Sequence, residues 1–139
     1  MTRRAPAWAL IEFALGLPLL LGVMLGSVAI GRVLWCERAV QSLASDAARV
    51  GALGSSPTDA SSRASARAGE LASDAGLDPG RLQVAIDTSG FGRGGWIVVQ
   101  ARYQVVPLGP GAINQDGPWW VGGQARERVD RYRSGVRGS

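Results

Sequence analysis

The N-terminal part of the chain is one long apolar run. Residues 7–31 read AWALIEFALGLPLLLGVMLGSVAIG, 25 residues with a single charged side chain, that of Glu12. A helix of this length spans about 37 Å, which exceeds the thickness of a bilayer's hydrocarbon core, about 30 Å. The run therefore predicts a transmembrane helix.

The charges on either side of the run indicate its orientation. Arg3, Arg4 and the amino terminus precede it, whereas Arg32, Glu37 and Arg38 nearly balance one another after it. Positive charge is preferentially retained on the cytoplasmic side of a membrane. We therefore expect the short N-terminus in the cytoplasm and the remainder of the chain outside.

A cleaved secretory signal peptide is the alternative interpretation of the same run. Such a signal has a basic start, an apolar stretch and a box of small residues, which residues 27–29 (Ser-Val-Ala) supply. Cleavage there would release a soluble protein. Two features count against it, because the apolar stretch continues to Trp35 and Glu12 interrupts the part that should be most apolar.

Three features inside the run depart from a plain apolar helix. Glu12 either has a partner or reaches back to the cytoplasmic headgroups, because an unpaired carboxylate at the bilayer centre costs about 2.5–3.5 kcal/mol. Pro18 removes a backbone hydrogen bond and should kink or loosen the helix. Gly22 and Gly26 form a GxxxG spacing, which permits close helix packing, although Gly and Pro are common in membrane helices generally.

An amphipathic helix is expected to continue from the apolar run. Apolar side chains recur at steps of three and four residues from Trp35 to Leu53, polar ones fill the other face, and Gly54 ends the helix. The apolar stripe suits packing against a sheet or sister helices, or equally against its own domain. A second, weaker helix begins at Ser56 and closes near Gly76. Its apolar positions are mostly Ala, so we expect it to be the least firmly packed element.

Alternating apolar and polar residues predict a small sheet in the C-terminal half. Residues 82–87 and 97–105 read as antiparallel strands joined by a hairpin, and a third strand is expected from Trp119 to about Val129. A loop of about a dozen residues at 107–118 connects the last two strands. The predicted class is α+β, with about three antiparallel strands. The expected domains are a leader 1–7, a transmembrane helix 8–34, an amphipathic extension 35–54 and an extracytoplasmic head 55–139.

The composition excludes several kinds of chemistry. The chain has no His and one Cys, Cys36, so a Ser-His-Asp or Cys-His relay, an imidazole metal site and an intrachain disulfide are all ruled out. We expect no catalytic residues, cofactor, metal or small-molecule substrate. The net charge is +4, and the Arg residues are interspersed with acids, which argues against nucleic-acid binding. Cys36 either pairs with another subunit or is a small, semi-apolar interface residue.

Two short motifs lie near the predicted sheet. Residues 90–95 (GFGRGG) match the spacing GxGxxG, but a strand follows them rather than a helix, so a hairpin tip is expected instead of a dinucleotide site. Trp119 and Trp120 follow Pro118. They could form an exposed contact with a partner, although a strand that buries one Trp and exposes the other is the commoner outcome.

The most distinctive motif is a basic stub, then Glu12 followed by Phe13 within the run IEFALGLPLLL at residues 11–21. It resembles the start of TadE-like proteins, the pilin-like accessory subunits of tight-adherence (Flp-type) pilus systems. The resemblance implies a prepilin-type signal, in which a membrane peptidase removes a short basic leader before a helix whose fifth residue is Glu. The implied cut falls between Ala7 and Trp8, with Ala7 where the family usually has Gly.

The same resemblance implies a function and a set of partners. The chain would be a non-enzymatic, membrane-anchored minor pilin or pseudopilin-like subunit of the cytoplasmic membrane, with Glu12 pairing with the new amino terminus of a neighbouring subunit. The implied partners are the lipid bilayer, sister pilin-like subunits, the major Flp-type pilin, the prepilin peptidase and the inner-membrane assembly platform. The alternative function is a secreted or signal-anchored binding domain unrelated to pili.

Overall fold

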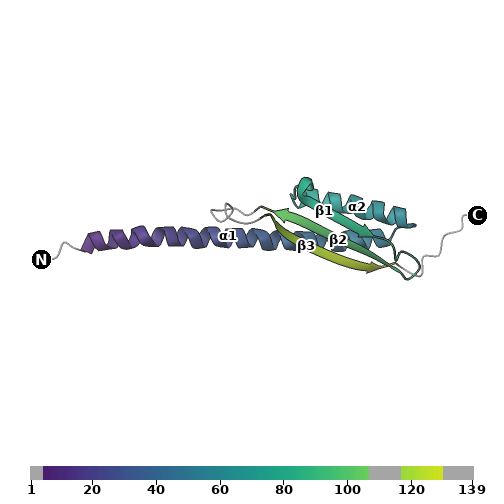
Figure 1. Cartoon of the computed structure of the whole chain (residues 1–139), viewed down its shortest axis with the longest axis horizontal. Coiled ribbons are helices and arrows are strands. Elements are labelled where there is room, and N and C mark those ends of the chain that lie inside the picture. The colour runs from purple at the N-terminus through teal and green to yellow at the C-terminus, as the bar shows by residue number, and fades with distance from the viewer. Residues whose placement is uncertain (1–4, 107–116, 130–139) are drawn as a thin grey trace, which may run out of the picture.

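One long helix supports a small head built from a second helix and a three-stranded sheet (Figure 1). The computed structural model describes residues 5–106 and 117–129. The elements are α1 (Ala5–Ala52), α2 (Pro57–Asp74), the short 3₁₀ helix η1 (Pro79–Arg81), β1 (Leu82–Asp87), β2 (Trp96–Val105) and β3 (Trp119–Arg128). The α+β class predicted from the sequence is confirmed.

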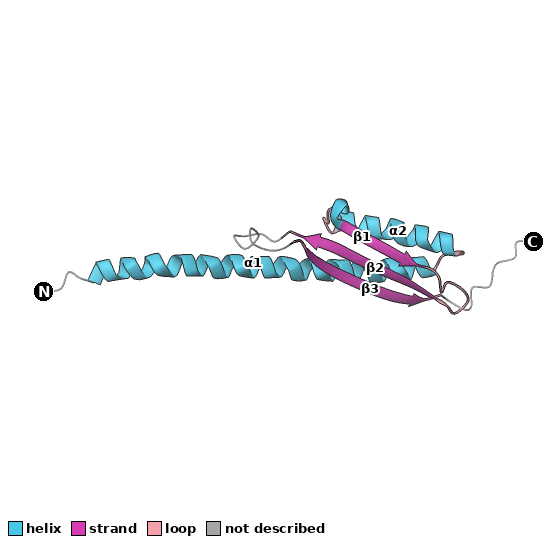
Figure 2. Ribbon diagram, in the orientation of Figure 1, coloured by secondary structure: helices cyan, strands magenta, loops and turns pink. Residues whose placement is uncertain are grey.

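Helix α1 has two halves with different surroundings. Its N-terminal half extends away from the head, and its C-terminal half lies against the sheet and α2 (Figure 2). The helix is continuous over 48 residues and includes Pro18, so the proline does not end it, and the predicted kink or loosening stays a prediction. At its end, Gly54 donates a backbone hydrogen bond to Gly51 at 2.9 Å, which closes the last turn close to where the sequence placed it.

The sheet is an antiparallel meander in the order β1-β2-β3. Leu82 pairs with Tyr103 across β1 and β2, and Val105 pairs with Trp119 across β2 and β3. Alternate residues of β2 face α1 and α2, as the period-two pattern of its sequence predicts. These inward positions are fully or nearly fully buried and form the sheet side of the core: Ile97, Val99, Ala101, Tyr103 and Val105.

The connection between β1 and β2 is a compact turn rather than a phosphate-binding loop. Trp96 donates its backbone N–H to Gly90 at 3.0 Å, and Gly95 donates to Gly92 at 2.8 Å. The GFGRGG segment thus closes on itself and runs directly into β2. Because no helix follows, no helix N-terminus is available for a phosphate, and the hairpin-tip interpretation is confirmed. The predicted loop at 107–118 lies mostly outside the described residues.

Helix α2 is packed more closely than its sequence suggested. Its four buried positions are all alanines spaced four residues apart, and each is at most 1% exposed: Ala60, Ala64, Ala68 and Ala72. Small side chains on this stripe allow the α2 backbone to approach α1 closely. A Cβ added to Gly54 would lie only 2.5 Å from the Cα of Ala60. The expectation of a loosely packed helix was therefore wrong, because the alanines make a close contact in place of a bulky one.

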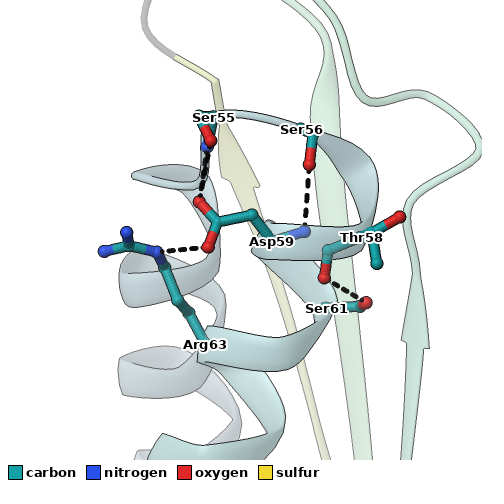
Figure 3. A network of polar contacts seen from close by, with 6 residues as sticks. All are labelled: Ser55, Ser56, Thr58, Asp59, Ser61 and Arg63. Carbon is teal, nitrogen blue, oxygen red and sulfur yellow. Dashed lines mark hydrogen bonds and ion pairs between the residues drawn. The ribbon is translucent and has the colours of Figure 1, made fainter.

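The start of α2 is held by reciprocal hydrogen bonds (Figure 3). Ser56 is the N-cap, and its hydroxyl accepts a hydrogen bond from the Asp59 backbone N–H at 3.1 Å. The Asp59 carboxylate in turn accepts bonds from the Ser55 backbone N–H at 2.8 Å and from Arg63 Nε at 2.9 Å. This arrangement is a variant of the capping box, in which the carboxylate accepts from the residue before the N-cap instead of from the N-cap itself.

We expect protonation of Asp59 to destabilise the head in acid. Hydrogen bonds from Ser55, and then from Arg63, lower the pKa of Asp59 from 3.8 to about 2. A carboxyl group whose pKa is lower in the folded state contributes stability above its unfolded pKa and loses it as the pH falls through the folded value. The melting-temperature difference between the parent protein and Asp59→Asn should be largest at neutral pH and should narrow between pH 3.8 and about 2.

This difference can be measured by circular dichroism on the full chain in detergent micelles. Asp74→Asn is the matched control, because Asp74 lies in the last turn of the same helix and its carboxylate makes no hydrogen bond within the described residues. The control should show a smaller change with pH. Equal pH profiles for the two variants would contradict the role given to the Asp59 hydrogen bonds.

Candidate functional site

The N-terminal half of α1 exposes a continuous apolar surface. Every residue from Trp8 to Val28 is exposed in the folded chain, and large apolar side chains make up most of them. Soluble monomers rarely expose an apolar surface of this extent. Within the described part of the chain, α1 is the one helix long and apolar enough to cross a membrane, judged by length and composition. Its place near the N-terminus suggests a single-pass anchor.

Glu12 is the one charged residue on this surface between Trp8 and Gly31. It is exposed, lies one helical turn after Trp8 and makes no hydrogen bond or ion pair with any other described residue. Phe13 beside it is also exposed. The carboxylate is therefore available to a group from another molecule. The bond between Ala7 and Trp8, at which cleavage was predicted, lies near the N-terminal end of α1.

The small residues predicted to pack against other helices have open space around them. A Cβ added to Gly16, Gly22 or Gly26 would have no atom within 4 Å. The GxxxG face thus has no partner within the described chain, and Pro18 lies on the same free part of α1. Packing of this face against sister helices stays a prediction.

A polar clamp joins α1 to the outer edge of β3. The Gln41 side-chain amide donates to the Gln124 carbonyl at 3.1 Å, and its oxygen accepts the Gln124 backbone N–H at 3.2 Å. These two bonds take the place of the backbone hydrogen bonds that a further strand would make, and they satisfy part of the otherwise unpaired outer edge of β3. Gly123 makes the approach possible, because a Cβ there would lie 2.6 Å from the Gln41 Cα. Sequence reasoning missed this contact, since an isolated Gln on a polar helix face carries no signal.

A groove runs along α1 beside the clamp. It has a volume of about 600 Å³ and is open to solvent. Its lining residues are Leu34, Glu37, Arg38, Gln41, Ser42, Ser45, Asp46 and Gly122. Within residues 5–106 and 117–129, no three His, Cys, Asp or Glu side chains are grouped so that they could hold a metal ion.

The tryptophans at the start of β3 are both exposed. Trp119 is 43% exposed and Trp120 is 48% exposed, so the commoner outcome, in which one is buried, is wrong here. Trp119 is on the side of the sheet that faces α1, yet it lies at the margin of the core and is only partly covered.

Cys36 is part of the core rather than an exposed thiol. It is 3% exposed and packs in the same apolar cluster as Val40 and Val105. Burial raises the pKa of its thiol, which keeps it protonated and unreactive at neutral pH. Of the two interpretations considered for Cys36, the burial agrees with a packing role.

These features define a class of protein: a small α+β head on one long helix whose free half carries an unpartnered apolar surface with one acid. The family model for TadE-like proteins matches residues 9–49, which confirms the resemblance seen in the sequence. The matched segment contains Glu12 and Phe13 and extends into the part of α1 that packs on the head. The match suggests an involvement with tight-adherence, Flp-type pilus systems. No curated protein and no solved structure matches the chain.

Proposed function

We propose that the chain is a membrane-anchored minor pilin or pseudopilin-like subunit that acts in the assembly of a tight-adherence pilus. The observation that carries the proposal is the TadE-like match over residues 9–49, which includes the single intramembrane acid. The free apolar half of α1 and the head on its other half supply a form that suits insertion among other helices. The role is structural, and no chemical step is required of the chain.

In this proposal, the anchor spans residues 8–34 and follows a leader of residues 1–7. The extension 35–54 then leaves the membrane and carries the head, residues 55–139, on the extracytoplasmic side. Arg32 and Arg38 follow the apolar run on α1, but Glu37 lies between them, so positive charge prevails before the run rather than after it. The prepilin peptidase and the inner-membrane assembly platform would act on the cytoplasmic end of this anchor.

Glu12 would select the assembly partner. After cleavage, the new amino group of a sister subunit or of the major pilin is a cation at the positive end of a helix dipole. Opposite charges attract strongly in a low-dielectric layer, and a register that leaves either charge unpaired is penalised. Gly22 and Gly26 would let the neighbouring helix approach closely while this pair forms.

The intact mass and N-terminal sequence of the protein from its native membrane fraction test this function. We expect a chain that begins at Trp8, because a prepilin peptidase would remove residues 1–7. A chain that still carries the leader would indicate an uncleaved signal anchor and would contradict processing. A chain that begins at Ile30 would indicate a secreted binding domain and would overturn the proposal altogether.

A further inference from the structure

Exposed tryptophans lie at both ends of the sheet. Trp119 and Trp120 begin β3, whereas Trp96 begins β2 and pairs with Arg128 at the opposite end. Figure 1 shows that β3 begins at the end of the head nearer the free half of α1 and runs away from it. Trp119 and Trp120 are therefore on the side of the head that faces the anchor, and Trp96 is on the far side.

Two close contacts give the level of these rings along α1. A Cβ on Gly123 would lie 2.6 Å from the Gln41 Cα, and a Cβ on Gly51 would lie 2.6 Å from Cδ1 of Ile97, which pairs with Glu127. Four residues of β3 thus correspond to ten residues of α1, close to the roughly nine expected from rises of about 3.3 Å and about 1.5 Å per residue.

This correspondence between residues of β3 and residues of α1 places the start of β3 where the apolar run ends. Trp119 lies four residues before Gly123 in β3, so it falls near the level of residue 31 of α1. Trp120 falls near the level of residues 33 and 34 of α1. Val33 is the first large side chain of α1 to pack against the core. Trp35, on α1 at almost the same level, is 52% exposed. Three exposed tryptophans therefore lie within about one helical turn of α1, about 6 Å along its axis, where the apolar run ends.

Charged groups accompany these rings. Arg32 is exposed on α1 at that level, and Arg102 lines a shallow groove with Trp120 and Gly122. Tryptophan is enriched at membrane–water interfaces, where its amphipathic ring lies at the level of the headgroups, and guanidinium groups bind phosphate. The combination of half-exposed Trp and Arg next to an apolar anchor matches the chemistry of the headgroup layer.

We propose that Trp35, Trp119 and Trp120 form a belt that seats the head directly on the outer surface of the bilayer. The occupant of this surface is lipid, because the belt is continuous with the lipid-facing side of α1. Arg32 and Arg102 contact lipid phosphates beside the rings. These contacts with lipid hold the head against the membrane before any assembly partner arrives. This inference rests on the proposed membrane anchor and does not depend on the pilus role.

Trp96 supplies an internal control. It is also exposed, at 38%, but it lies at the far end of the sheet, with the guanidinium of Arg126 4.3 Å from its ring centroid. A ring held there should contact water and Arg126 rather than lipid. Any general effect of tryptophan exposure would appear at Trp96 as well.

The test uses the full chain reconstituted in phosphatidylcholine–phosphatidylglycerol vesicles. Three variants keep a single Trp at position 96, 119 or 120, with Phe at the other four Trp positions, and circular dichroism checks that each is folded. Lipids brominated near the headgroup end of the acyl chains should quench Trp119 and Trp120 at least about threefold more strongly than Trp96. Aqueous iodide should show the opposite order.

Equal quenching at all three positions by brominated lipid, or stronger quenching of Trp119 and Trp120 by iodide, would overturn the proposal. The second result would mean that these rings lie in water, where they are open to a protein partner rather than to lipid. Because the vesicles contain no pilus components, a failed pilus role for Glu12 would leave the lipid result unchanged. The two proposals can thus fail separately.

Discussion

Glu12→Ala is expected to reduce incorporation of the subunit into the pilus fraction about ten- to a hundredfold, because a hydrogen bond to a charged group is worth about 1.5–3 kcal/mol. The level of the variant in the membrane should not fall. Removing the charge makes insertion easier by about 2.5–3.5 kcal/mol if the residue lies deep in the bilayer. Assembly and anchoring should therefore respond in different ways to the same substitution.

The measurement is immunoblotting of sheared pili and of membranes from cells in which the variant replaces the native protein. Glu12→Asp keeps the charge and should retain part of the incorporation. Glu37→Ala removes an exposed acid from the same helix outside the apolar run and should have no effect. Normal piliation and incorporation with Glu12→Ala, at unchanged membrane level, would refute the role assigned to this carboxylate.

Gly54→Ala is expected to destabilise the head by about 3 kcal/mol, at the upper end of the usual penalty for overpacking. The added Cβ would lie 2.5 Å from the Cα and 2.6 Å from the backbone N of Ala60. Both are backbone atoms, so the contact cannot be relieved by rotating a side chain. The start of α2 would have to move away from α1, and this movement would loosen the contact between the buried alanines of α2 and α1.

Gly69→Ala is the matched control for this experiment. Gly69 is exposed within α2, the helix whose start Gly54 contacts, and a Cβ on Gly69 would have no atom within 4 Å. The control should be stabilising by about 0.5–1 kcal/mol, because Ala favours a helix interior over Gly. Thermal unfolding of the two variants in detergent micelles compares them directly. Equal melting temperatures would show that Gly54 is not a close-contact position.

Most of the secondary structure could be predicted because it depends on local pattern. The apolar run, the amphipathic continuation of α1 and the alternation in β1 and β2 are each visible within a few residues of sequence. The N-cap at Ser56 is equally local, because its hydroxyl bonds to a backbone N–H three residues later. Such features need no knowledge of distant segments.

The packing of α2 was predicted less well. A stripe of alanines looks weak when apolar area is considered alone, yet the same small side chains let the backbones of α1 and α2 meet. A rule based on one residue type therefore omitted the geometry around the alanines.

Parts of the candidate site could not be predicted because they join distant residues. Gln41 and Gln124 are 83 positions apart in the chain, and their paired hydrogen bonds exist only once β3 has docked on α1. The exposure of both Trp119 and Trp120 likewise depends on where the core ends, which the strand pattern does not reveal.

The sequence by itself determined that this chain has a long apolar helical run with one acid, a helical continuation and a small antiparallel sheet. These properties follow from hydrophobicity and backbone periodicity, which act over short stretches of chain. Only the tertiary structure decided which glycines are close contacts, that Cys36 is buried and that both Trp119 and Trp120 stay exposed. Those outcomes depend on how α2 and the sheet pack against α1, which is set by contacts between segments that the local sequence pattern does not relate.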